Sequence, residues 1–124
     1  MVVADLTEVS DFLLKNLKNM KNKEFNGFAS EAQYEAAFNA VKNAIVEFDS
    51  LDYFAVYGNP DNRTIDVQAG SGLNFTIDYD GSIQNIECDY PFNMFEVEMI
   101  QDIYENAESI LAVYEQYQPK EANV

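Results

Sequence analysis

The sequence predicts an α+β fold in two layers. Two N-terminal helices precede a four-stranded antiparallel β-meander, and a long acidic C-terminal helix follows, in the order α-α-β-β-β-β-α. The hydrophobic period indicates this order, because helical spacing changes to alternation near residue 53 and returns near residue 93. Short turn motifs separate the alternating runs, which favours strands paired in sequence order. We expect residues 1–124 to form one domain, with one sheet face packed on the helices.

Two amphipathic helices are expected before the sheet. The first covers residues 5–22, where Leu6, Val9, Leu13, Leu17 and Met20 recur at helical spacing. The second covers residues 30–49, and Ser30 with Gln33 has the spacing of a capping box. Its apolar face consists of Tyr34, Ala37, Phe38, Val41, Ile45 and Phe48.

Four alternating runs follow, at residues 53–57, 63–69, 73–79 and 83–88. The pair Asp80-Gly81 is typical of a two-residue type I′ turn between the last two strands. With that turn, Phe75 faces Ile86 on one side of the sheet and Asp78 faces Ile83 on the other.

The final helix is expected from about residue 93 to 117, and Pro119 ends it. Its apolar face consists of Ile100, Ile103, Ala107, Ile110, Leu111 and Tyr114.

The charge balance excludes several classes of function. Seven Lys and Arg against 22 Asp and Glu give a net charge of −15, which would repel nucleic-acid phosphates. The absence of His and the single Cys exclude His-dependent catalytic triads, zinc sites built from His or Cys, and internal disulfides. The sequence shows no phosphate-binding glycine motif, and we expect the protein not to be an enzyme.

No signal peptide or membrane-spanning run is visible in the sequence, so we expect a cytoplasmic protein. One segment, residues 76–87, partly matches a calcium-binding loop. Thr76 stands where the loop requires Asp, and the predicted hairpin separates Asp80 from Glu87. We therefore expect neither a metal nor another cofactor.

The acidic residues are concentrated in one part of the chain. From Asn43 to Pro119 there are fifteen acidic residues and one basic residue, Arg63. On a helical wheel, Glu98, Asp102 and Glu105 lie within about 60° of one another and opposite the apolar face. The expected main partner-binding surface consists of Glu98, Asp102, Glu105, Glu108 and Glu115. A second expected patch consists of Asp78, Asp80, Glu87 and Asp89.

This pattern suggests a nucleic-acid mimic. Carboxylates recur on a helix at roughly 5–6 Å, so they present a nearly continuous negative field that attracts a basic cleft. In composition the chain is similar to phage anti-restriction and anti-CRISPR proteins and to immunity proteins of nuclease toxins. That similarity implies an inhibitor whose partner is a basic nucleic-acid-binding protein, such as a nuclease or a CRISPR or restriction effector. We expect the protein to be a monomer or a homodimer. The alternative is a structural or adaptor domain whose acidic surface serves solubility alone.

Overall fold

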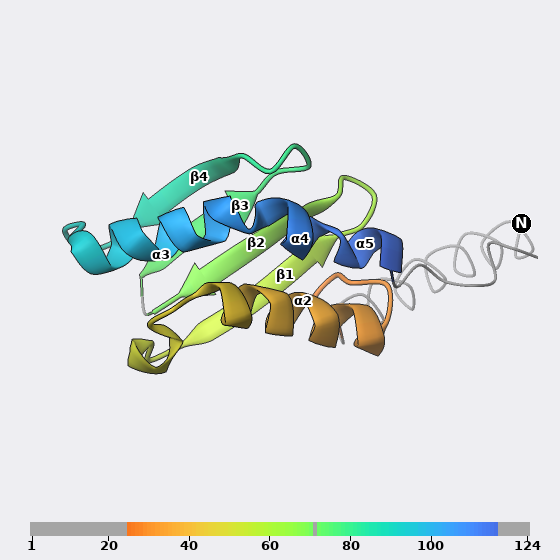
Figure 1. The fold of residues 1–124 in the computed structure, drawn as a ribbon, viewed down its shortest axis with the longest axis horizontal. Helices are drawn as coiled ribbons and strands as arrows, with labels where there is room; N and C mark the ends of the chain where they lie inside the picture. The colour runs from red at the N-terminus through yellow and green to blue at the C-terminus, as the bar shows by residue number, and fades with distance from the viewer. Residues whose placement is uncertain (1–24, 71, 117–124) are drawn as a thin grey trace, which may run out of the picture.

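The computed structural model describes residues 25–70 and 72–116 (Figure 1). One helix precedes the sheet, and a short 3-10 helix connects the two. Three consecutive helices follow the sheet. In chain order the elements are α2 (Glu31–Ala44), η1 (Phe48–Ser50), β1 (Phe54–Asn59), β2 (Thr64–Ala69), β3 (Leu73–Ile77), β4 (Ile83–Cys88), α3 (Met94–Glu105), α4 (Ala107–Leu111) and α5 (Val113–Gln116).

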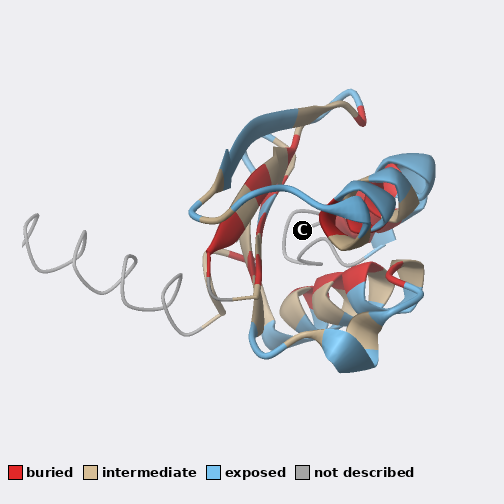
Figure 2. Cartoon of the chain, turned by 90° about the vertical axis from the view of Figure 1, so that its left-hand side faces the viewer, coloured by how far each residue is buried: buried red, intermediate tan, exposed pale blue. Residues whose placement is uncertain are grey.

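The sheet is an antiparallel meander with the order β1-β2-β3-β4, which confirms this part of the prediction. Figure 2 shows the described helices gathered on one face of the sheet. Residues that alternate along the strands, such as Val56, Val67 and Phe75, are paired across the sheet and buried under those helices. The α+β class therefore follows from a sheet with one apolar face covered by amphipathic helices.

The predicted order α-α-β-β-β-β-α is wrong. The described chain has α2 before the four strands and three short helices after them. The first expected helix, residues 5–22, lies outside the described residues. The expected long C-terminal helix breaks at Asn106, whose side chain donates a hydrogen bond to the Asp102 carbonyl oxygen at 2.8 Å. Asn at this position competes with the regular helix ladder, and its backbone leaves the helical conformation (φ −110°, ψ 10°).

Helix α2 is also shorter than expected, because it ends at Ala44 rather than near residue 49. The next residue, Ile45, adopts an extended conformation and remains buried. Phe48 belongs to η1 instead, where its ring packs edge-on against Phe54. The apolar positions were thus identified correctly, but the chain buries them with a bend that periodicity does not reveal.

The predicted register of β3 and β4 is also wrong. Ile83 pairs with Ile77, not with Asp78, so the connection has five residues instead of two. The Asp78 N–H donates to the Ser82 carbonyl oxygen and closes this wider turn. The register then shifts between Asn74 and Thr76, and Asn85 on the facing strand has a φ of 55°. This bulge leaves Phe75 buried and Ile86 exposed, so the two are not a matched pair on one face.

The core lies between the sheet and the helices, and both layers contribute to it. It includes Ile65 and Leu73 from the sheet, Val41 from α2 and Ile103 from α3, each fully buried. Every member of the expected apolar face of the last helix is buried or half-buried, including Tyr114. None of the helices in the described ranges is long and apolar enough to cross a membrane.

Candidate acidic interface

The nine expected partner-binding acids all remain at least partly accessible. Asp78 and Asp102 are half-buried, and the other seven are exposed: Asp80, Glu87, Asp89, Glu98, Glu105, Glu108 and Glu115. Accessible residues form one surface only where they lie near one another. Whether these nine acids do so depends on how the turns and helices pack.

One turn of the sheet meets the helices. Gly81 lies against α4, where a Cβ added to it would be 3.6 Å from the Ala107 Cβ. This packing places Asp80 beside Glu105 and Glu108 in a shallow cleft of about 470 Å³. Acids 25 or more residues apart in sequence therefore share one cleft, which joins part of the second expected patch to the main surface.

Asp80 is held by its own turn. One of its carboxylate oxygens accepts hydrogen bonds from the Ser82 hydroxyl at 2.6 Å and from the Ser82 backbone N–H at 3.0 Å. These hydrogen bonds, the hydroxyl first, lower the pKa of Asp80 below its ordinary value. The carboxylate thus stays ionised over a wider pH range, and the turn holds its orientation.

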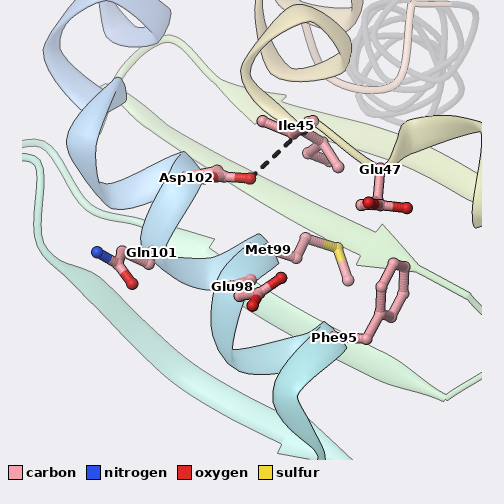
Figure 3. A pocket seen from close by; sticks show the side chains of 8 residues that line it. Ile45, Glu47, Phe95, Glu98, Met99, Gln101 and Asp102 are labelled. Atoms are coloured by element: carbon pink, nitrogen blue, oxygen red, sulfur yellow. Dashed lines mark hydrogen bonds between the residues drawn. The ribbon is translucent and has the colours of Figure 1, made fainter.

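A second hollow lies between the end of α2 and the first turns of α3. Figure 3 shows Glu98, Met99 and Phe95 of α3 on one side and Glu47 on the other. Asp102 also lines this pocket, and one of its oxygens accepts a hydrogen bond from the Val46 N–H at 3.3 Å. The structure thus brings Glu98 and Asp102 together with Glu47, which was not among the expected site residues.

The remaining expected residues do not join these two clefts. Glu115 forms an ion pair with Arg63, with 2.9 Å between Oε1 and Nε, so its charge is already matched. Glu87 pairs with Asn74 and lines a hollow with Asp66 on the sheet face away from the described helices.

Two further expected residues also lie apart. Asp78 uses a carboxylate oxygen to accept the Tyr79 N–H at 2.8 Å. Asp89 lies beyond the end of β4 and next to Gly72, whose carbonyl oxygen accepts the Asp89 N–H.

Sequence reasoning missed one aromatic side chain in the interface. Tyr104 is 61% exposed and lines the cleft of Asp80, Glu105 and Glu108. On a helical wheel with Glu98 at 0°, Tyr104 falls at about 240°, just outside the apolar face of the helix. An aromatic side chain outside that face was the signal that could have identified it.

The acids of the two clefts have no ion-pair partner among the described residues. Arg63 with Glu115 is the single salt bridge in residues 25–70 and 72–116. Lys42 lies over the Phe48 ring, with 5.4 Å between Nζ and the ring centroid. Within the same ranges, no group of three or more His, Cys, Asp or Glu side chains is arranged to hold a metal ion.

Comparison with known proteins does not add a relationship. No protein-family model matches the chain, and neither a curated protein nor a solved structure does.

Proposed function

We propose that the protein is a stoichiometric inhibitor that occupies the basic nucleic-acid-binding cleft of a target protein. The observation that supports this proposal is the meeting of Asp80 with Glu105 and Glu108 in one cleft without a matching cation among the described residues. Carboxylates left unpaired repel one another and lower the stability of the folded state. A partner that supplies the missing cations relieves this repulsion on binding.

The spacing of the charges suits the imitation of a phosphate backbone. Six carboxylates line the two clefts, three in each. Four of them belong to the stretch from Glu98 to Glu108, and Glu47 and Asp80 come from other segments. A continuous helix of that length would rise by about 15 Å at 1.5 Å per residue. Duplex DNA carries one charge per roughly 1.7 Å, or about nine over the same length. The charge density is therefore within a factor of about two of that of DNA.

The proposed mechanism needs no catalytic turnover. The negative field accelerates encounter with a basic cleft, and hydrogen bonds to the carboxylates then slow dissociation. Exposed Tyr104 adds an aromatic anchor beside the charges, of the kind that is enriched at the centre of interfaces. The target's own nucleic acid is excluded because both ligands need the same cations.

The first test is capture of a target, followed by competition. The protein is immobilised at low ionic strength, exposed to a nuclease-treated bacterial lysate and eluted with a salt gradient. The captured protein is then assayed for binding to its nucleic acid in the presence of increasing amounts of the inhibitor. We expect one basic protein at a stoichiometric ratio, and its nucleic acid should be displaced at equimolar inhibitor.

The decisive variant is E98Q/D102N/E105Q, which keeps the helix shape and removes three charges. Losing three charge pairs of up to about 1 kcal/mol each should weaken displacement roughly 10- to 100-fold at low salt. The matched control is E35Q/D52N/D61N, which removes three exposed charges outside both clefts and should displace as the wild type does.

Two outcomes would contradict the proposal. Equal losses in the two triple variants would show that net charge alone matters. Recovery of many basic proteins without displacement would favour the adaptor interpretation, in which the acids only provide solubility.

A further inference from the structure

The pocket between α2 and α3 combines an apolar floor with an acidic rim. Ile45 is 4% and Met99 2% exposed, and half-buried Phe95 completes the apolar part. The rim carries the carboxylates of Glu47 and Glu98 (Figure 3). Asp102 lies farther along α3, where its hydrogen bond from the Val46 N–H joins α3 to the connection between α2 and η1.

The size of the pocket favours a single side chain over a separate small molecule. Its volume is about 240 Å³, whereas small-molecule pockets usually measure about 300–1,000 Å³. An occupant that suits both parts has an apolar stem that packs on the floor, where Phe95 leaves more surface exposed than Met99 or Ile45, and a cationic end that meets the rim. A neutral apolar side chain would cover the floor but would draw the rim carboxylates out of water without a partner.

We propose that this pocket receives an arginine side chain of the basic partner. The methylene stem covers Met99 and Ile45, and the guanidinium lies against the Phe95 ring while it donates hydrogen bonds to Glu47 and Glu98. Arginine fits better than lysine because its planar group both stacks on an aromatic ring and donates to two carboxylates at once. This inference rests on the proposed function, since the arginine belongs to the protein that the acidic surface binds.

The pocket can be tested without knowing the partner. The full chain, labelled with ¹³C at the methionine methyl groups, is titrated by NMR with the tripeptide Gly-Arg-Gly. We expect a saturable shift of the Met99 methyl signal, while Met94, which is 66% exposed and does not line the pocket, serves as an internal reference. Gly-Lys-Gly and Gly-citrulline-Gly test the guanidinium and the charge, and both should bind more weakly.

Two single variants separate the pocket from general charge. E98Q should weaken binding of Gly-Arg-Gly by up to about fivefold, as expected for the loss of one accessible charge pair of up to about 1 kcal/mol. E35Q removes the same charge from an exposed residue that lines neither cleft, so it should leave the titration unchanged.

The inference is overturned if the Met99 and Met94 signals shift together, if the lysine peptide binds as tightly as the arginine peptide, or if E98Q and E35Q weaken binding equally. Failure here remains distinguishable from failure of the proposed function. If the wild type still displaces the target from its nucleic acid but the peptide does not shift the Met99 signal, only the arginine pocket is contradicted. If the arginine peptide binds in the pocket but the protein does not displace nucleic acid from a target, the inhibitor proposal is contradicted.

Discussion

At the residue scale, Tyr114 shows how a single polar atom joins the two layers. Its side chain is 5% exposed, and its hydroxyl accepts the Asn59 N–H at 3.1 Å and donates to the Thr64 carbonyl oxygen. These two backbone groups belong to the facing ends of β1 and β2, so the hydroxyl closes the sheet hairpin from the helix layer. Burial is the main reason that the pKa of Tyr114 is raised well above its ordinary value.

We expect Tyr114→Phe to lower the free energy of unfolding by about 1–3 kcal/mol at pH 7, because it removes two part-buried hydrogen bonds to backbone groups. Since the pKa is raised in the folded state, the contribution of the hydroxyl is complete below the unfolded pKa of about 10 and is lost as the pH rises further. The difference between the two proteins should therefore narrow at alkaline pH. Urea unfolding at pH 7 and above pH 10 measures both effects.

The control for this prediction is Tyr104→Phe, which removes a hydroxyl from a side chain that is 61% exposed. It should change the unfolding free energy by less than about 0.5 kcal/mol. A Tyr114→Phe variant as stable as this control would show that the hydroxyl makes no net contribution.

At the element scale, the strands could be predicted from the sequence and the connections could not. Alternation located all four strands because burial of one sheet face imposes a period of two. The break at Asn106 coincides with a local hydrogen bond that competes with the helix ladder, and the register shift coincides with the positive φ of Asn85. Neither feature interrupts the hydrophobic pattern. The β3–β4 turn was placed correctly but was wider than its Asp-Gly pair suggested, because Asp78 and Ser82 close a larger loop.

The outer edge of β1 provides a prediction at this scale. Residues 25–28 cover this edge, where the Gly58 N–H donates to the Asn26 carbonyl oxygen at 2.8 Å. A Cβ on Gly58 would lie 2.3 Å from the fully buried ring of Phe28. We expect Gly58→Ala to lower the free energy of unfolding by about 1–3 kcal/mol through overpacking, measured by urea unfolding.

A double-mutant cycle tests the cause. In a Phe28→Leu background the smaller side chain leaves room for the added methyl group, so Gly58→Ala should cost less there. An equal cost in both backgrounds would place the effect in the backbone of β1 rather than in contact with Phe28.

At the scale of the whole molecule, the candidate interface depends on packing that one-dimensional patterns do not contain. The sequence indicated that Glu98, Asp102 and Glu105 share one side of a helix, and in the structure they lie on α3 beside the two clefts. It grouped Asp80 and Glu87 in one patch, whereas the β3–β4 turn carries Asp80 to α4 and Glu87 lies on the sheet face away from the described helices. Nor did it reveal that Arg63 from the β1–β2 turn would neutralise Glu115. Contacts between distant segments decided each of these outcomes.

The final prediction concerns the cost of the unpaired charge. Glu98 with Asp102 and Asp102 with Glu105 are like-charged neighbours on α3, and the last turn of this helix contains no cation. Each such pair destabilises a helix by about 0.2–0.5 kcal/mol, and carboxylates near a helix C-terminus are unfavourable as well. We therefore expect E98Q/D102N/E105Q to melt a few degrees above the wild type in thermal unfolding at low salt. The difference in melting temperature between the variant and the wild type should disappear near 1 M salt, where the screening length falls to about 3 Å.

The same variant is expected to displace nucleic acid from the target less well, so its stability and its binding should change in opposite directions. The control E35Q/D52N/D61N should gain stability from the lower net charge while it keeps full binding. A triple α3 variant that is less stable than the wild type at low salt would mean that these carboxylates support the fold. The unpaired acids favour a functional surface because they lower stability and because partner binding would explain why they are kept. Without that stability cost, the acids would no longer favour a functional surface over a solubilising one.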